Sequence, residues 1–230
     1  PATPAIAPQA KPRAIGLDIP GTGQASVNVV KPAIPRSDPD YYPSLVATTV
    51  LGGGYSARLN QEIRIKRGLS YGASARISAA RTTGSFRASA QTKNESATQV
   101  LELIDAELTK LAAGPAGPEE LTARKSGLVG DYGRELATSG GLADILGNFA
   151  IYGVSLDEVG RYTAKVEAVD AAQVQAFARR AFDPAQASVV VAGDAKAYAG
   201  ALKARLPNLE VIPVGELDLD SPTLRKKSLP

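Results

Sequence analysis

Residues 51–72 read Leu-Gly-Gly-Gly-Tyr-Ser-Ala-Arg-Leu-Asn-Gln-Glu-Ile-Arg-Ile-Lys-Arg-Gly-Leu-Ser-Tyr-Gly, and they set the order of the elements on either side. The three glycines at 52–54 stop one helix and let the backbone reverse, because a residue without a Cβ accepts conformations closed to others. A short amphipathic helix follows. Gly68 ends it, and 70–72 begin an extended run. The stretch therefore predicts a helix, a turn, a second helix and a strand.

The short second helix is expected to present two side chains to a ligand. Ser56 is its predicted N-cap, and Leu59 and Ile63 lie on one apolar face. Arg64 lies near the C-terminal end of the helix, and Tyr71 lies just past the break, seven residues on. A cation and a phenol held by one rigid corner can both point at the backbone of one bound peptide.

The glycine-rich stretch also allows interpretations that involve no ligand. A glycine triplet followed by a basic helix is also the pattern of a turn and a solvated helix face. A phosphate-binding loop would need Gly-x-x-x-x-Gly-Lys-Ser/Thr, which residues 52–58 do not supply. They do not form Gly-x-Gly-x-x-Gly between a strand and a helix either, so phosphate binding is not predicted.

The same stretch resembles the signature of a known family. The matching runs are Leu51–Gly54, Ser56–Leu59, Glu62–Arg64 and Arg67–Tyr71. They are similar to the pitrilysin/insulinase family of zinc metallopeptidases, which includes the mitochondrial processing peptidases, and more narrowly to the half of those enzymes that does not carry the zinc. In looser form the resemblance extends from about residue 25 to about residue 194.

The resemblance implies roles for five residues. In this family the zinc-free half contributes an arginine and a tyrosine, seven residues apart, to an active site built mainly by its partner half. Arg64 and Tyr71 fall on those positions, as catalytic residues that hold a substrate carbonyl and stabilise the oxyanion. Gly52, Gly53 and Gly54 would line the chamber beside the substrate. The residues alone also allow purely structural roles. Tyr71 could pack in the strand, Arg64 could bond a carbonyl at the helix end, and the glycines could simply form a turn.

The absence of histidine and cysteine restricts the chemistry of the chain. With 0 His it has neither a His-based zinc motif nor a Ser-His-Asp triad, and with 0 Cys it has no thiol nucleophile. We therefore expect no metal site and no cofactor in this chain. By the resemblance, zinc belongs to a partner half, either a separate subunit or a missing N-terminal segment, and the chain is inactive alone. Ser/Lys hydrolysis is a distant third hypothesis.

Composition narrows the partners further. The net charge is +3, and the 26 Lys and Arg residues are spread out rather than gathered with aromatics, so nucleic acid is not an expected partner. No apolar run reaches the roughly 20 residues that span a membrane. A peptide substrate is expected, and association between copies of the chain is left open. The compartment is undecided, with the periplasm slightly favoured over the cytoplasm.

The domain organisation is expected to be simple. Residues 1–12 form a flexible Pro/Ala-rich leader, 13–214 a single α+β domain, and 215–230 an unstructured tail. Near the start, strands at 13–19 and 25–31 should pair as a hairpin.

The remaining elements follow from apolar spacing and from capping residues. A helix capped by Asp38 leads to the glycine triplet, and strands at 70–79 and 84–92 pair. Helices are expected after Asn94, Pro118, 139–141, a Ser155–Glu158 capping box and Asp170, then a strand at 188–192, a helix near 195–206 and a strand near 209–214. This order predicts an α+β fold, a mainly antiparallel β-sheet with helices packed on one face. The resemblance implies the same fold, the half-domain of a pitrilysin or processing-peptidase type metallopeptidase.

Two hypotheses for function follow. In the first, the chain is the non-zinc half of a zinc-dependent endopeptidase and supplies substrate-binding and oxyanion-stabilising residues to a zinc-bearing half. In the second, it is a non-catalytic scaffold or assembly module of the same fold. Retention of both Arg64 and Tyr71 favours the first, because a scaffold has no need of the pair.

Overall fold

The computed structural model describes residues 11–226. Residues 1–10 of the expected leader and 227–230 of the expected tail lie outside the described residues. The strands are β1 (Ala14–Asp18), β2 (Ala25–Ala33), β3 (Ala73–Ser78), β4 (Gly84–Thr92), β5 (Ser188–Gly193) and β6 (Leu209–Pro213). The α-helices of the described part are α1 (Tyr41–Gly52), α2 (Ala97–Ala113), α3 (Pro118–Leu136), α4 (Ser139–Tyr152), α5 (Glu158–Ala168), α6 (Ala171–Ala181) and α7 (Ala195–Arg205). Each predicted helix and strand has its counterpart among them, except the short helix after the glycine triplet, which contains the π-helical segment Asn60–Ile65.

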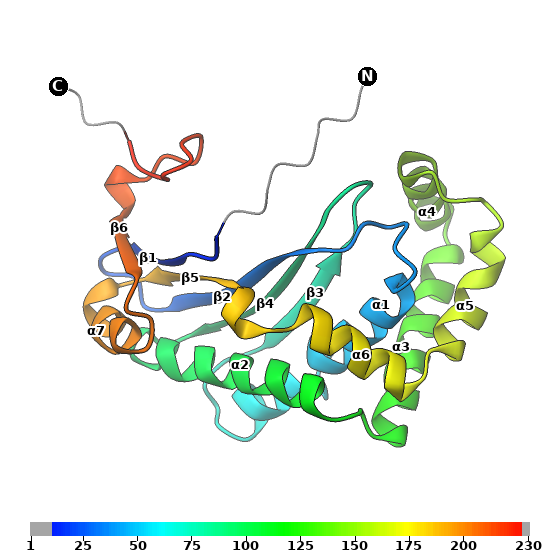
Figure 1. Ribbon diagram of the computed structural model, residues 1–230, viewed down its shortest axis with the longest axis horizontal. Helices are drawn as coiled ribbons and strands as arrows, with labels where there is room; N and C mark the ends of the chain where they lie inside the picture. The colour runs from blue at the N-terminus through cyan, green and yellow to red at the C-terminus, as the bar shows by residue number, and fades with distance from the viewer. Residues whose placement is uncertain (1–10, 227–230) are drawn as a thin grey trace.

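The strands form one six-stranded sheet in the order β3-β4-β2-β5-β1-β6 (Figure 1). The pairs from β3 to β5 are antiparallel, and β1 runs parallel to both β5 and β6. The fold is α+β as predicted, but the sheet is mixed, with its parallel part at the β6 edge.

The predicted hairpin between the first two strands is wrong. β5 lies between β1 and β2, parallel to the first and antiparallel to the second. Its Val189 and Val191 are buried, so this apolar strand occupies a central place in the sheet. Local turn signals at Gly21 cannot reveal a strand that arrives some 160 residues later, because they report only on neighbouring sequence.

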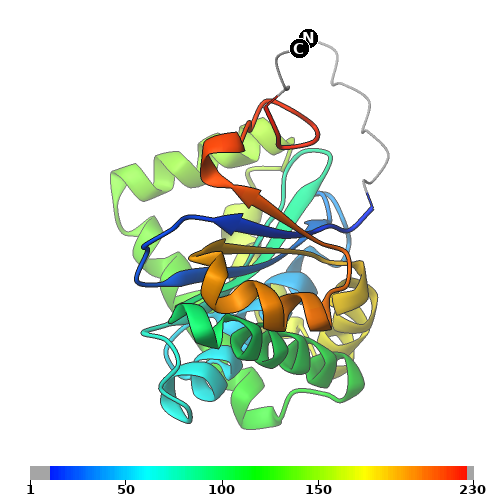
Figure 2. The same cartoon turned by 90° about the vertical axis from the view of Figure 1, so that its left-hand side faces the viewer.

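Helices cover one face of the sheet. Alternate strand residues such as Val27, Val29 and Ala88 are fully buried and belong to the same apolar core as α1, α2 and α6. Figures 1 and 2 show these helices and α7 on the same side of the sheet. The polar residues that alternate with the buried ones point to the opposite side.

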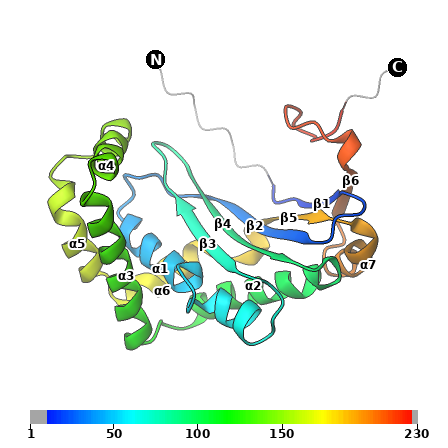
Figure 3. The same cartoon turned by 180° about the vertical axis from the view of Figure 1, so that it is seen from behind.

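Helices α3, α4 and α5 form a second cluster at one end of the molecule (Figure 3). It has a small core of its own around Tyr132, Ile145 and Phe149. Helix α3 also packs against α1, which joins this cluster to the main body beside the glycine turn.

Two predicted helix caps are also wrong. The Asp38 carboxylate accepts a hydrogen bond from the Asp40 N–H at 2.8 Å, which closes a turn before α1 begins. Asn94 lies in a 3-10 turn ahead of α2, and its side chain instead bonds Thr22 and Asp194 in two loops. Asp170, by contrast, caps α6 in a complete capping box. Polar side chains near a helix start can bind distant backbone as readily as the helix itself.

The expected unstructured tail is folded where it is described. Residues 214–216 form a 3-10 turn, and Leu217 bridges Arg225. The Arg225 guanidinium pairs with Glu216 at 2.6 Å and donates to the Val211 carbonyl of β6 at 2.8 Å. Polar contacts to the β6 edge therefore hold this segment, and an apolar pattern could not have predicted them.

Candidate functional site

The glycine turn is tightly packed at its first residue. A Cβ on Gly52 would lie 1.9 Å from the backbone nitrogen of Ala75 in β3, so α1 and the strand can approach only because this residue is glycine. Gly54 has φ of +121°, in the region that favours glycine. A Cβ on Gly53 would lie 2.7 Å from the Cα of Thr49, so each of the three glycines has a structural reason.

The helix after the turn differs from the prediction at its start. It contains one π-helical segment, Asn60–Ile65, and no side chain caps it. Ser56 is not its N-cap, because Ser56 still lies in the turn and its oxygens accept hydrogen bonds from Arg124 of α3. Leu59 and Ile63 are fully buried on one face, as predicted.

Asn60 connects the two ends of this corner, and no sequence pattern predicted this role. Its side-chain amide donates to the Gly54 carbonyl at 3.0 Å and accepts from the Ala73 N–H at 2.8 Å. Asn60 is buried, so both bonds are shielded from water. The turn before the helix and the strand after it are thereby held in one geometry.

The predicted helix end at Gly68 is confirmed. Gly68 has φ of +62°, and its N–H donates to the Arg64 carbonyl at 2.9 Å. The next N–H, of Leu69, donates to the Ile63 carbonyl at 2.9 Å, so the carbonyls of Ile63 and Arg64 both have partners at the helix end. The chain then leaves the helix at a fixed angle toward Tyr71.

Arg64 and Tyr71 lie on one groove with a volume of about 800 Å³. Tyr71 is 89% exposed, so it is not a packing residue of the strand. The guanidinium carbon of Arg64 lies 4.8 Å from the centroid of the Tyr55 ring. Gln24, from the β1–β2 connection, and Gln91, near the end of β4, line the same groove.

The salt bridges around the helix leave Arg64 available. Glu62 pairs with Lys66 and, at 2.5 Å, with Arg67. Hydrogen bonds from these two cations hold the pKa of the Glu62 carboxyl below its usual value. Within the described part of the chain no ion pair includes Arg64. Its contact is the Tyr55 ring, which restrains it without neutralising it.

Arg58 has a structural role instead. Its Nε and Nη2 atoms donate to the two carboxylate oxygens of Glu120 at 2.9 and 2.7 Å. This bidentate pair fastens the glycine corner to the first turn of α3.

The three glycines lie on a different groove from Arg64 and Tyr71. Gly52, Gly53 and Gly54 line a groove of about 480 Å³ together with residues 74–78 of β3 and Asp131 of α3. The two predicted sets of site residues are adjacent in sequence but do not share one groove.

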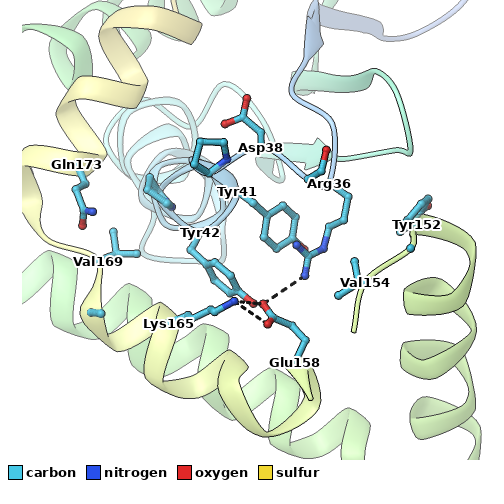
Figure 4. Close-up of a pocket in the computed structure, with 15 residues that line it drawn as sticks. Arg36, Asp38, Tyr41, Tyr42, Tyr152, Val154, Glu158, Lys165, Val169 and Gln173 are labelled. Carbon is cyan, nitrogen blue, oxygen red and sulfur yellow. Dashed lines mark hydrogen bonds and ion pairs between the residues drawn. The ribbon is translucent and has the colours of Figure 1, made fainter. Parts of the chain in front are cut away.

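A buried carboxylate forms a second polar cluster, which sequence reasoning did not identify (Figure 4). Glu158 of α5 accepts hydrogen bonds from the Tyr42 hydroxyl and, at 2.7 Å to each oxygen, from Lys165. The Arg36 guanidinium lies 3.8 Å from the Glu158 carboxylate. It also stacks on the Tyr41 ring, with 3.6 Å between the guanidinium carbon and the ring centroid. These residues line a pocket of about 530 Å³.

This cluster replaces the predicted Ser155–Glu158 capping box. Glu158 does not bind the backbone at the start of α5, and no side chain caps that helix. The Glu158 side chain is only 8% exposed and turns toward α1. Burial opposes its ionisation, but the hydrogen bonds from Lys165 and Tyr42 outweigh burial and lower the pKa of the Glu158 carboxyl. The same burial and the adjacent carboxylate raise the pKa of Tyr42. The cluster is a fully paired network that joins α1 to α5.

The residues of this chain do not fit a zinc ion. A zinc site takes three or four His, Cys or carboxylate ligands. The sequence contains no His and no Cys, and residues 11–226 contain no group of three or more such side chains that could hold a metal. No zinc chemistry is therefore assigned to these residues. Among the same residues, no helix is long and apolar enough to cross a membrane.

Comparison with known proteins identifies the family. The sequence profile of the peptidase M16 inactive domain matches residues 1–128, more than half of the chain. The chain therefore belongs to the peptidase M16 inactive domain family, which confirms the resemblance to the zinc-free half of pitrilysin-like peptidases.

Individual relatives agree with this assignment. An uncharacterised zinc protease of Streptomyces coelicolor is 30% identical over 158 residues, which are 69% of this chain and 34% of that protein. The crystal structure of a peptidase M16 inactive domain from Pseudomonas fluorescens is 27% identical with a TM-score of 0.73, over 84% of this chain and 47% of that one. A protease from Helicobacter pylori shares the fold at 20% identity and a TM-score of 0.74, over 80% of this chain and 44% of that one. The chain thus spans less than half the length of each of these relatives.

Proposed function

We propose that this chain is the substrate-side half of a zinc-dependent endopeptidase and acts together with a zinc-bearing half. The observation that carries the proposal is the placement of Arg64 and Tyr71 on one groove, with Tyr71 89% exposed. A large aromatic side chain at this exposure contributes little to the core, so a role toward a ligand explains it better. Because the chain spans a third of its curated relative, the zinc-bearing half is either another part of a longer polypeptide or a separate subunit.

Tyr71 would stabilise the oxyanion. When water attacks a peptide carbonyl, negative charge develops on the carbonyl oxygen. A phenol placed against that oxygen donates a hydrogen bond without carrying a charge of its own. Loss of one such donor typically lowers turnover by about 100- to 1000-fold. The partner half supplies the metal, and this chain supplies the donor.

Arg64 would hold the substrate in place. Its guanidinium is oriented by the Tyr55 ring, and its N–H groups can donate to a backbone carbonyl of a peptide in the groove. A restrained donor loses less conformational entropy when the peptide binds. The glycines 52–54 would form a neighbouring wall, on the groove along β3.

Under the scaffold hypothesis, Arg64 and Tyr71 have no required function. An assembly module would use the fold without needing an exposed donor beside a restrained cation. The two functions can therefore be separated by testing whether Tyr71 affects cleavage.

The decisive experiment is peptide cleavage by this chain alone and by this chain with its zinc-bearing half, each with Tyr71 and with Tyr71→Phe. We expect no turnover by the chain alone, and turnover by the pair that falls about 100-fold or more in the variant. Tyr55→Phe is the matched control, because it removes an exposed hydroxyl but keeps the ring beside Arg64. If the pair cleaves equally well with Phe at 71, the oxyanion role is wrong. If no zinc-bearing half yields cleavage, the scaffold function is the better explanation.

A further inference from the structure

The face of the sheet opposite the helices carries an unusual set of side chains, which we call the open face. Its residues on β2 to β5 follow from the strand registers: Ser26, Asn28, Val30, Pro32, Ser74, Arg76, Ser78, Ser85, Arg87, Ser89, Gln91, Ser188, Val190 and Ala192. The set contains two arginines and no Asp or Glu. This part of the surface is therefore small, polar and positively charged.

The two arginines stand directly opposite each other. Arg76 of β3 is paired in register with Arg87 of β4, and both are exposed. Like charges in directly opposed positions destabilise a sheet. Because this pairing costs stability in the free protein, it suggests that a bound anion neutralises the two charges when the protein acts.

Within the described residues, neither guanidinium has an ion-pair partner. No ion pair among residues 11–226 includes Arg76 or Arg87. The Nε of Arg87 donates to the side-chain oxygen of Asn28 at 2.9 Å, which orients this guanidinium along the sheet. Its terminal nitrogens remain available as donors, and two N–H groups of one guanidinium match the two oxygens of a carboxylate.

The arginine pair has a defined position relative to the Arg64 and Tyr71 groove. Gln91, which lines that groove, lies on β4 four residues from Arg87 and on the same face. Four residues of strand span about 13 Å. An extended peptide with one residue in the groove would therefore bring a side chain about four residues away to the arginines.

We propose that Arg76 and Arg87 bind an acidic side chain of the peptide substrate, about four residues from the bond that is cleaved. The occupant is a peptide carboxylate because the face offers donors and no aromatic side chain on which a nucleic-acid base could stack. The inference rests on the proposed function for its peptide substrate, and it defines a preference for Asp or Glu at a distance from the cleaved bond.

The test measures binding without cleavage. Fluorescence anisotropy compares a labelled extended peptide that contains Glu with its Gln analogue, on this chain at low ionic strength. We expect the Glu peptide to bind about 10-fold more tightly, and Arg76→Gln/Arg87→Gln to reduce this ratio to about 1. Lys196→Gln/Lys203→Gln is the control, because it removes two exposed charges of α7, on the helix side of the sheet, and should keep the ratio. Melting curves establish that both variants are folded.

Several results would overturn the inference. A Glu-to-Gln affinity ratio near 1 in the unchanged chain would show that there is no carboxylate preference. A ratio that stays near 10 in Arg76→Gln/Arg87→Gln would show that these two residues do not cause it. Inorganic phosphate that competes as well as the Glu peptide would show a general anion site instead. Tyr71→Phe should leave the binding ratio unchanged, so a failure of the oxyanion role and a failure of this preference are distinguishable. In the paired enzyme, a peptide series with one Glu at each position should be cleaved best with Glu about four residues from the bond, and a flat profile contradicts the placement.

Discussion

The side-chain oxygen of Asn60 accepts the backbone N–H of Ala73 at 2.8 Å, and this one bond fixes the end of the β3 strand relative to the helix that carries Arg64. The same amide donates to the Gly54 carbonyl, so the corner is closed on both sides. The chain between these residues also carries Tyr71. The relative position of the two proposed site residues thus depends on a buried amide whose hydrogen bonds go to Gly54 and Ala73.

Replacement of this amide should loosen the corner. Asn60→Ala leaves the Ala73 N–H and the Gly54 carbonyl without their partner, at a cost of about 1–3 kcal/mol for each buried group left unsatisfied. We expect a lower urea midpoint and, in the paired enzyme, a lower kcat/KM. Asn208→Ala, at an exposed turn, is the control and should change neither. Unchanged stability in Asn60→Ala would show that water replaces the amide at no cost.

The glycine turn provides a test of the close approach between α1 and β3. Gly52→Ala places a Cβ 1.9 Å from the Ala75 nitrogen, so the helix end or the strand must move. We expect a loss of about 1–3 kcal/mol in the free energy of unfolding, as for other overpacked positions.

Gly127→Ala in α3 is the matched control for that change. A Cβ there meets nothing within 4 Å, and alanine is the better helix former by about 1 kcal/mol. Opposite signs for the two substitutions, measured by urea denaturation, would establish that steric contact and not glycine content decides the effect. Equal effects would contradict the close packing at Gly52.

Local sequence signals were enough to predict the fold. The predictions failed where distant residues compete with neighbouring ones for a polar side chain. Gly68 and Asp170 act on their own neighbours, so their patterns predicted the observed helix end and helix cap. Ser56 and Glu158 also fit local capping patterns, but Arg124 and Tyr42 from other elements bind them instead. A capping motif records only what a side chain can do nearby, and tertiary partners decide what it does.

The candidate site was predictable to a similar degree. The spacing of Arg64 and Tyr71 placed both on one groove, because a helix end and a rigid turn connect them. The glycines line a separate groove along β3, which depends on how α1 meets the sheet. Asn60 and Arg76 carried no signal, since their importance comes from strand pairing that no local pattern reports.

The buried Glu158 should make stability depend on acid. Its folded-state pKa lies below the ordinary value of 4.5, so its contribution is complete above about pH 4.5 and is lost as the pH falls through the lowered folded-state pKa. Glu158→Gln should lower the free energy of unfolding by about 1–3 kcal/mol at pH 7. It should also flatten the loss of stability between about pH 5 and pH 3.

Urea denaturation across this pH range checks the prediction. Glu167→Gln, an exposed carboxylate on the same helix, is the control and should keep the acid dependence of the unchanged protein. If Glu158→Gln and the unchanged protein lose stability in parallel below pH 5, the carboxylate network is not the source of the acid sensitivity.

Arg64 and Tyr71 should have different kinetic signatures in the paired enzyme. A carbonyl held by Arg64 is bound in the ground state and in the transition state alike, so Arg64→Gln should raise KM by about 10- to 100-fold with little change in kcat. Tyr71→Phe should lower kcat with little change in KM, because its hydrogen bond strengthens as charge develops. Arg67→Gln is the matched control, since Arg67 lines the same groove but is paired with Glu62 and should leave both parameters near their original values. Steady-state kinetics on one peptide measure all three, and a fall in kcat for Arg64→Gln with unchanged KM would move Arg64 from substrate positioning to the stabilisation of the transition state.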